Sequence, residues 1–310
     1  MEETPCPLCG QTSATTLFVG RDLAYGTPGR YPVRRCAACG ALYLSPRPGA
    51  GEMEQHYVEG YAPHALPRQA EGRQRRSLER ATVKLIRAVE SRAPIPGRAL
   101  DVGCGSGDFL SALEHKGWQV DGVEINPRAA AEAQARLRGR IHEGELVQAG
   151  YASATFDLVT FWDVLEHLHA PCQAVREAAR ITKAGALLVA TVPNVRSLEA
   201  RLFGAQWAGW DVPRHLWWAE PDRLRRLLEE NGWRVEGFAC LRGRHWLFVL
   251  GLRLWLEART LPRGLRRAVL AFAESWPARA LSLPYFVVVE GFKLGSILGV
   301  FARRENTVVD

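Results

Sequence analysis

The sequence has little lysine, no long uninterrupted apolar run and no apolar leader. Lysine occurs only four times, so the formal net charge of +7 comes almost entirely from arginine. No stretch reaches the roughly 18 uninterrupted apolar residues that a membrane-spanning helix needs. The acidic start, Met-Glu-Glu-Thr, is unlike the basic and apolar regions of a secretory signal. We therefore expect a cytoplasmic protein, either free or peripheral at the inner membrane face, whose thiols stay reduced.

The composition is ordinary for a globular protein. Of the 310 residues, 47% are hydrophobic and 24% are charged. A chain of this length can bury one large core or two smaller ones. A basic run extends over residues 68–92. We interpret it as a solvated helix face, with contact to an anionic partner as the alternative.

Four of the seven cysteines form two C-x-x-C pairs, Cys6 with Cys9 and Cys36 with Cys39. Two such pairs in one short segment predict a zinc site. Four thiolates complete a tetrahedral shell and leave no open position, so the metal would be structural. The 26 residues between the pairs have room for a β-hairpin with a turn at 26–29. A dithiol redox pair is the alternative, but it would need a single C-x-x-C beside a βαβ unit.

A glycine-rich turn follows a buried apolar segment that starts at Arg98. The turn reads GCGSGD (103–108) and leads into a helix-like segment. A strand, such a turn and a helix together let a backbone approach a nucleotide-like ligand closely. The next strand-like segment ends in Glu124, and an acid at this position can hold both ribose hydroxyls. NAD is not favoured, because the turn lacks the third glycine of the dinucleotide fingerprint.

At this point the sequence resembles the class I methyltransferases. The residues that carry the resemblance are DVGCGSGDFL (101–110), GVEIN (122–126), GEL (144–146), FDLVTFWDVLEHL (156–168) and TVPN (191–194). The N-terminal segment CPLCG and RCAACGALYLSPRP is also similar to a zinc-ribbon leader in a bacterial subset of this family. Members of that subset often modify sugars, lipids or secondary metabolites.

The resemblance implies S-adenosylmethionine as the cofactor. It implies that Asp101, Gly103 and Gly105 hold the methionine moiety and that Glu124 binds the ribose. Glu145 stands where the family usually places an aspartate near the adenine. The further cofactor residues implied in this way are Cys104, Gly107, Ile125, Phe161 and Trp162.

From residue 98 onward, strand-like and helix-like segments alternate. Such alternation predicts a doubly wound sheet with its ligand at the carboxyl ends of the strands. The expected fold class is α/β, with a Rossmann-like seven-stranded methyltransferase sheet, an N-terminal zinc-binding module and a helical insertion between the last two strands. Strands are expected near 98–103, 119–124, 140–142, 156–163, 186–192, 235–241 and 297–302.

We divide the chain into five segments. They are a four-cysteine zinc-binding module (1–50), a helical linker (51–96), a Rossmann-like S-adenosylmethionine-binding core (97–242), an apolar helical insertion (243–294), and the last strand with the tail (295–310). The insertion has arginines on its flanks. We expect it to form a helical cap packed on its own core or a dimer contact. The alternative is a peripheral membrane contact or a surface for a greasy substrate.

Asp163, Glu166 and His167 follow the fourth expected strand with the spacing of one helix face. The spacing also resembles the metal-binding residues of ubiquinone-pathway O-methyltransferases. A divalent cation held by these three residues is therefore an alternative to a packing role. Asp163 and His167 are both catalytic candidates.

Arg214 and His215 follow the fifth expected strand in a tryptophan-rich segment. The tryptophans predict either the wall of a substrate pocket or packing. His215 is the first candidate for a general base, because an imidazole titrates near neutrality, and His167 is the second. Arg214 can grip an anionic group of the substrate with two hydrogen bonds.

We expect an enzyme that methylates an oxygen, or as second choice a carbon, of a small molecule, sugar or lipid. The N/D-P-P-Y/F motif of amino-methyltransferases that act on bases is missing, so a nucleic-acid partner is not expected. One alternative is an RNA-binding or RNA-modifying methyltransferase that uses the zinc module and the basic helix. A cofactor-binding regulator without activity is another.

Overall fold

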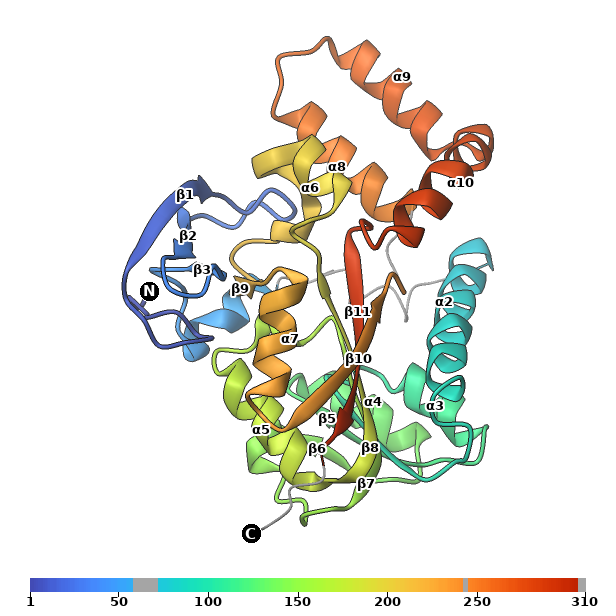
Figure 1. Ribbon diagram of the computed structural model, residues 1–310. Helices are drawn as coiled ribbons and strands as arrows, with labels where there is room; N and C mark the ends of the chain where they lie inside the picture. Colours follow the sequence, from blue (N-terminus) through green and yellow to red (C-terminus); the bar gives the residue numbers. More distant parts are fainter. Residues whose placement is uncertain (58–71, 242–244, 306–310) are drawn as a thin grey trace. The chain divides into compact units, whose positions relative to one another are not determined.

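The computed structural model describes residues 1–57, 72–241 and 245–305 (Figure 1). The chain forms two compact units, each assembled from separate stretches of sequence. Unit 1 comprises Met1–His56, Val192–Leu224 and Phe238–Gly299, and unit 2 comprises Tyr57–Thr191, Arg225–Gly237 and Val300–Asp310. The boundaries of these two units differ from those of the five predicted segments, and the division into five segments stays a prediction. Part of the predicted basic run, residues 68–71, lies outside the described residues.

The predicted seven-stranded sheet is confirmed, in the order β10-β11-β8-β7-β4-β5-β6. The pairs β4·β5, β4·β7, β5·β6 and β7·β8 are parallel. Six of the seven strands begin within two residues of their expected starts, and β8 begins earlier. Their bounds are β4 (Arg98–Val102), β5 (Gln119–Glu124), β6 (Ile141–Glu143), β7 (Phe156–Trp162), β8 (Thr182–Pro193), β10 (Trp233–Ala239) and β11 (Ile297–Arg304).

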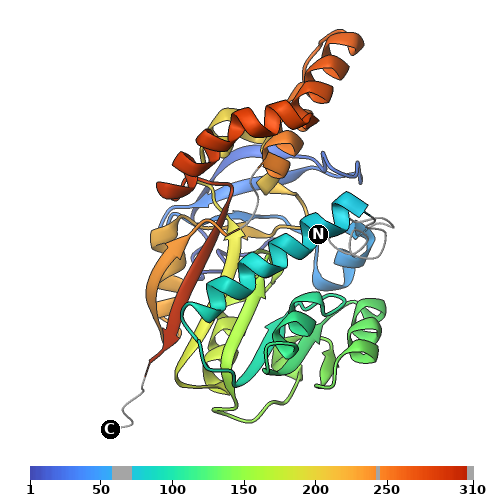
Figure 2. The same ribbon diagram turned by 90° about the vertical axis from the view of Figure 1, so that its right-hand side faces the viewer.

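Helices cover both faces of this sheet. Figures 1 and 2 show α2 and α3 on one face, and α5 on the other face in Figure 1. Several helices begin where the sequence supplies a cap: the side chain of Asn126 accepts a hydrogen bond at the start of α4, and a proline opens it. The bounds are α2 (Gly72–Glu90), α3 (Asp108–Glu114), α4 (Pro127–Arg136), α5 (Pro171–Ile181), α7 (Pro221–Glu229), and the short η2 (Leu146–Gln148) and η3 (Leu165–His167).

Unit 1 contains a second, antiparallel sheet in the order β1-β2-β3-β9. The hairpin predicted between the two cysteine pairs is confirmed, with Ala14 opposite Cys36 and Gly20 opposite Tyr31. The short strand β9 adds Trp217 opposite Tyr43. The bounds are β1 (Ala14–Gly20), β2 (Tyr31–Cys36), β3 (Leu42–Leu44), β9 (Trp217–Trp218) and the 3-10 helix η1 (Ala50–His56).

Three helices of unit 1 lie between β10 and β11 in the sequence. His245 of α8 contacts the other two, with its ring nitrogens 2.8 Å from the Ala273 carbonyl oxygen and 3.0 Å from the Ser282 hydroxyl. In the described part of the chain, no helix has the length and apolarity to cross a bilayer. The bounds are α8 (His245–Glu257), α9 (Arg263–Glu274), α10 (Trp276–Gly291), α6 (Leu198–Phe203), η4 (Gly204–Gln206) and η5 (Ala208–Trp210).

The tryptophan-rich segment of unit 1 packs on itself. Trp210 contacts Trp207 and Trp218 edge-on, with ring centroids 5.4 and 5.0 Å apart. Trp217 and Trp218 are each only 1% exposed. Trp210 also packs on Phe18 of β1 at 5.0 Å. This geometry favours packing, which was one of the two predicted roles, over the wall of a pocket.

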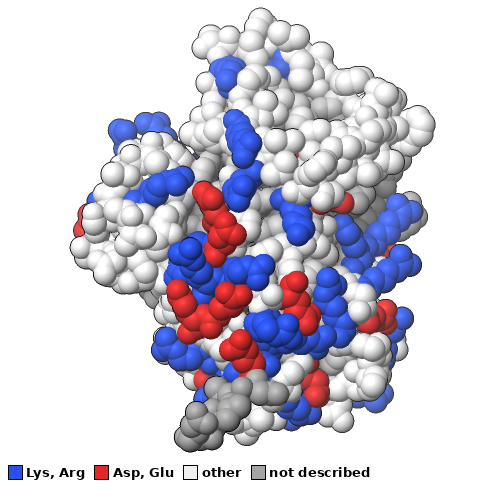
Figure 3. All heavy atoms as spheres, in the orientation of Figure 1, with Lys and Arg blue, Asp and Glu red and all other residues white. Residues whose placement is uncertain are grey.

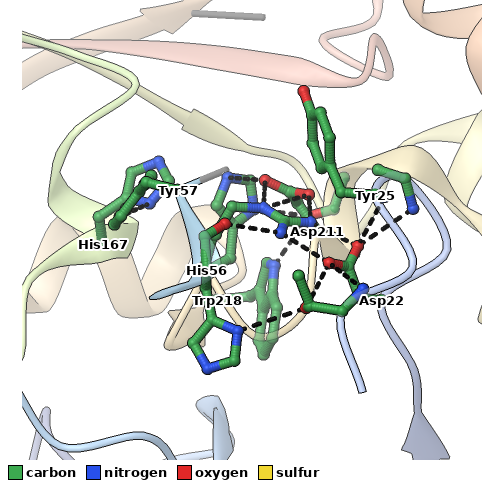
Figure 4. A network of polar contacts seen from close by, with 12 residues as sticks. Asp22, Tyr25, His56, Tyr57, His167, Asp211 and Trp218 are labelled. Carbon is green, nitrogen blue, oxygen red and sulfur yellow. Dashed lines mark hydrogen bonds and ion pairs between the residues drawn. The ribbon is translucent and has the colours of Figure 1, made fainter. Parts of the chain in front are cut away.

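A buried ion network joins distant parts of unit 1 (Figure 4). The Arg214 guanidinium donates to both carboxylate oxygens of Asp22 at 2.7 and 2.9 Å, and to Asp211 at 2.7 to 3.1 Å. A further bond of 3.2 Å reaches the backbone oxygen of His56. The side chains of Arg214 and Asp22 are both 0% exposed. The bidentate geometry is the one that best compensates the desolvation of a buried arginine.

The Asp22 carboxylate also organises the segment after β1. It accepts hydrogen bonds from the backbone N–H groups of Ala24, Tyr25 and Thr27, and from the Thr27 hydroxyl at 2.6 Å. Burial raises the pKa of Asp22, but the bonds from Arg214, Thr27 and Tyr25 outweigh it. They hold the pKa well below the usual range of a carboxyl group.

We expect Arg214→Met to destabilise the protein by about 3–5 kcal/mol, because it leaves buried carboxylates without their cation. Urea denaturation would measure the loss. The matched control is Arg253→Met, which removes an exposed pair with Glu274 in the same unit. That change should cost at most about 1 kcal/mol. Equal effects of the two variants would contradict the structural role of Arg214.

The pH dependence provides a second readout. Because the pKa of Asp22 is lowered on folding, its contribution is present above about pH 4 and is lost as the pH falls further. The wild type should therefore lose stability between about pH 4 and pH 2 more steeply than Arg214→Met. If Arg214→Met does not fold, the milder variant Asp22→Asn should likewise lose less stability than the wild type between about pH 4 and pH 2.

Candidate functional site

The turn after β4 has the conformation that only glycine adopts without strain. Gly103 and Gly105 have φ values of 72° and 54°, in the left-handed region. A Cβ on Gly103 would lie 2.4 Å from a methyl group of Val164, so this position must be glycine for close packing. A Cβ on Gly105 would meet no atom within 4 Å. The backbone of Gly105 therefore borders open space, as a ligand-binding turn requires.

Glu124 holds this turn in place from the end of β5. Its side chain is buried, and its two oxygens accept the backbone N–H groups of Gly105 and Asn126, each at 2.8 Å. Each carboxylate oxygen has a second lone pair, so the group can also accept ribose hydroxyls. The position and the fixed orientation fit the ribose-binding role predicted for Glu124, which stays a prediction.

Asp101 and Cys104 lie deeper in unit 2. Asp101 is 2% exposed, and its carboxylate accepts the Thr160 hydroxyl of β7 at 2.6 Å. The Cys104 thiol packs so closely on Gly122 that a Cβ there would lie 2.7 Å from its sulfur. Burial raises the pKa of Cys104, so the thiol stays neutral. Sequence reasoning missed Thr160, although a threonine inside a buried apolar strand is the signal that could have identified it.

The other predicted cofactor residues occupy different environments. Ile125 is 69% exposed directly beside Glu124, so it offers an apolar surface for an adenine ring. Glu145 is exposed and forms a capping box with Gln148 at η2. Phe161 is fully buried in the sheet, which favours a packing role. Gly107, the last of the predicted glycines, adopts a left-handed φ of 81° as the N-cap of α3.

Trp162, at the end of β7, carries a buried polar atom without a partner. Its indole packs edge-on against Phe109 of α3, with centroids 5.0 Å apart. Its Nε1 has no hydrogen-bond partner among the described residues. Such a donor is costly to bury unless a ligand or water satisfies it. Together with the open space at Gly105, it indicates that this edge of the sheet accepts a polar ligand.

Asp163 follows Trp162 in a strained conformation. Its φ of 59° is unusual for a residue other than glycine, although aspartate tolerates it better than most. Its N–H donates to the Thr191 hydroxyl at 2.9 Å, and that hydroxyl donates to its carboxylate at 2.7 Å. These two bonds join the carboxyl ends of β7 and β8. The catalytic role predicted for Asp163 would take place at this edge of the sheet.

His167 lies in η3, and its Nδ1 is 3.3 Å from the hydroxyl of Tyr57 (Figure 4). Glu166 beside it is only 1% exposed. Asp163 and His167 thus already have polar neighbours in Thr191 and Tyr57. The divalent-cation site predicted for Asp163, Glu166 and His167 stays a prediction, and so does the catalytic role of His167.

His215 lies in unit 1 beside the tryptophan-rich segment, with its ring 6.4 Å from that of Trp218. Its Nδ1 is 3.0 Å from the backbone oxygen of Gly209. A carbonyl can only accept, so Nδ1 carries the hydrogen and the basic lone pair of the neutral ring is on Nε2. The neighbouring Arg214 is fully buried in its carboxylate network. Its predicted grip on an anionic substrate stays a prediction, but the geometry favours a structural role.

The four N-terminal cysteines converge as the zinc prediction requires. The sulfurs of Cys6 and Cys39 are 3.6 Å apart, and those of Cys9 and Cys36 are 3.5 Å apart. All four lie within 4.8 Å of one another. Tetrahedral zinc with Zn–S bonds of about 2.3 Å requires sulfurs about 3.8 Å apart, so the donor set fits this metal.

The two cysteine knuckles have matching backbone geometry. Gly10 and Gly40 both have a φ of 74°, and their N–H groups donate to the backbone oxygens of Cys6 and Cys36 at 2.8 and 3.0 Å. Burial raises the pKa of the Cys6 and Cys39 thiols. At Cys36 burial also raises the pKa, but backbone N–H donors outweigh it and bring the pKa to about 7.

Comparison with known proteins identifies the family. A family model described as a methyltransferase domain matches residues 63–236. The ubiquinone biosynthesis O-methyltransferase of Thiobacillus denitrificans is 32% identical over 164 residues, which cover 49% of this chain and 71% of that protein. The protein of the same name from Hahella chejuensis is 33% identical over 144 residues, covering 42% and 59%. The chain thus spans less than two thirds of the second relative.

Solved structures show the same fold. The cyclase SpnF matches with a TM-score of 0.55 at 18% identity, over 84% of this chain and 97% of that chain. StiE O-MT matches with a TM-score of 0.51 at 15% identity, over 81% and 84%. Similarity at this level establishes the fold and leaves the reaction open. The family model covers more than half of the sequence, and the residues that it matches include the glycine turn with its open space beside Gly105. The chain therefore belongs to the S-adenosylmethionine-dependent methyltransferases.

Proposed function

We propose that this methyltransferase transfers a methyl group to an oxygen of a small molecule. The relatives named above, which are O-methyltransferases by name, support the choice of oxygen. A sugar or lipid hydroxyl belongs to the same substrate class, and methylation of carbon is the second choice. The observation that carries the proposal is the glycine turn held by Glu124, with open space beside Gly105.

S-adenosylmethionine supplies an electrophilic methyl group when it is bound. The turn at Gly103 and Gly105, the Glu124 carboxylate and the apolar side chain of Ile125 would hold it. The protein then has to orient the acceptor and remove its proton. We assign proton removal to Nε2 of His215, because the bond from Nδ1 to Gly209 fixes the ring and its tautomer.

RNA as a substrate is not favoured. Binding of a phosphate backbone depends on basic residues that neutralise several phosphates at once. In the lower part of the face drawn in Figure 3, the blue side chains are interleaved with red ones. The names of the relatives also do not point to RNA.

The zinc ion and the compartment belong to this proposal. Cys6, Cys9, Cys36 and Cys39 would hold one structural zinc, which would fix the two knuckles relative to each other. None of the seven cysteines, all of which are described, forms a disulfide. A thiolate site of this kind is typical of a reducing cytoplasm, where we place the protein.

We expect Gly105→Arg to weaken S-adenosylmethionine binding at least about 100-fold, since its side chain would fill the open space beside the turn. Calorimetry would measure the affinity. The matched control is Gly185→Arg at the opposite, amino-terminal end of β8. Gly185 also has a left-handed φ and no neighbour near its Cβ position, so the strain is similar. Unchanged affinity in Gly105→Arg would remove this cofactor assignment.

We expect His215→Gln to slow turnover by about 100-fold or more while cofactor affinity stays intact. The rise of kcat with pH that reflects deprotonation of the base should also disappear. His115→Gln is the matched control, because His115 likewise places Nδ1 against a backbone oxygen but lies exposed at the C-cap of α3. A stable and fully active His215→Gln would transfer the proposal to His167.

We expect about one tightly bound zinc per chain in protein purified without added metal. Cys36→Ser should lose it, whereas Cys172→Ser, outside the cluster, should retain it. Elemental analysis would count the metal, and cobalt substitution should give the spectrum of a tetrahedral thiolate site. A folded module without metal, or a Cys6–Cys9 disulfide, would contradict the zinc site.

A further inference from the structure

The helices α8, α9 and α10 carry a large share of the exposed apolar side chains. Nine of the seventeen large hydrophobic residues that are exposed in the described chain lie in residues 245–293. They are Trp246, Leu265, Phe272, Trp276, Leu281, Leu283, Val287, Val288 and Phe292. Single exposed hydrophobic residues are normal on a protein surface, but such a concentration marks a surface that another molecule covers.

The solvent-facing side of α10 is almost entirely apolar. Trp276 and Leu281 near its start are 78% and 74% exposed, and Phe292 at its end is 74% exposed. The opposite side is anchored, because Phe286 and Val289 are buried. We call the exposed side, from Trp276 to Phe292, the apolar stripe. At 1.5 Å per residue the helix is about 24 Å long, so the stripe can lie along a surface but cannot cross a bilayer.

The helices α9 and α10 also carry basic residues. Arg279 lies on α10, Lys293 comes two residues after the end of this helix, and α9 adds three arginines, at 263, 266 and 267. Residues 245–293 contain seven basic and three acidic side chains. One of the acids, Glu274, is paired with Arg253 at 2.6 Å. In Figure 3 the part of the molecule formed by these helices is largely white, with blue side chains among the white ones.

The charge decides between two kinds of partner. In a symmetric dimer the same patch lies on both copies, so the basic residues of one copy would face those of the other. A bilayer with anionic lipids instead offers apolar chains below a negatively charged surface, and these two features complement the apolar stripe and the basic residues of α9 and α10.

We infer that α9 and α10 dock the protein on the surface of a bilayer that contains anionic lipids. The apolar stripe enters the boundary between headgroups and acyl chains. Trp276 lies at the level of the headgroups, where tryptophan is enriched in membrane proteins. The arginines of α9 contact the lipid phosphates. This function is independent of methyl transfer, because it involves none of the residues assigned to the cofactor or the acceptor.

Co-sedimentation of the full chain with lipid vesicles tests the inference. Vesicles with about one third phosphatidylglycerol should bind the protein, and pure phosphatidylcholine should bind it at least about 10-fold more weakly. Salt at about 1 M should release it. Trp276→Ser with Leu281→Ser, and separately Arg266→Glu with Arg267→Glu, should each reduce binding at least about 10-fold. Trp276, Leu281 and Arg267 are exposed and Arg266 is half-buried, so folding should be preserved.

Matched controls lie elsewhere on the chain. Ile95→Ser removes an apolar side chain that is 82% exposed outside these helices, and Arg128→Glu with Arg234→Glu reverses two other surface arginines. Both controls should bind vesicles like the wild type. Calorimetry with S-adenosylmethionine on every variant separates this result from the methyltransferase proposal. The inference fails if the wild type ignores anionic vesicles, or if it is a dimer in solution that the Trp276→Ser, Leu281→Ser variant dissociates.

Discussion

The conformation of the glycine turn after β4 depends on one buried carboxylate. Glu124 is taken out of water, and it is stable there because two backbone N–H groups bind it. The bonds connect the turn after β4 with the start of α4, two segments that follow neighbouring parallel strands. The same turn is also held by the backbone N–H groups of Gly103 and Cys104, which donate to the Val123 oxygen at 2.7 and 3.1 Å. A change at Glu124 would therefore alter the shape of the turn as well as remove the carboxylate that we predict to bind the ribose.

Much of the sheet could be predicted from the sequence, because buried parallel strands are short apolar runs bounded by glycine and polar residues. The strand expected at 119–124 has the same first and last residues as β5. By contrast, β8 begins at Thr182, four residues before its expected start. After the buried Thr182, its next three residues, Lys183 to Gly185, are exposed and include no large apolar side chain, so they lack the apolar signal on which the expectation rested. The hairpin between the two cysteine pairs could also be predicted from the sequence, because the distance between the pairs has room for two short strands and a turn.

The environment of Arg214 could not be predicted in this way. Its main partner, Asp22, is 192 residues away in the sequence, and no local pattern connects the two. From its neighbours alone, Arg214 resembled a residue that binds substrate. The tryptophans beside it gave a similarly ambiguous signal, because burial and ligand binding both favour large aromatic side chains. Only the tertiary structure distinguishes an arginine that is neutralised inside the protein from one that faces a ligand.

The order of the strands also has a consequence for how the chain acquires its structure. In the sheet β11 lies between β8 and β10, yet it is the last strand to be synthesised, after the three helices α8 to α10. While those helices leave the ribosome, β8 and β10 still lack their shared neighbour β11, so the edges that it will cover are unpaired. Completion of the sheet requires contacts between residues far apart in sequence, which is intrinsically slow. The nascent protein should thus pass through an open-edged intermediate in which aggregation competes with insertion of the final strand.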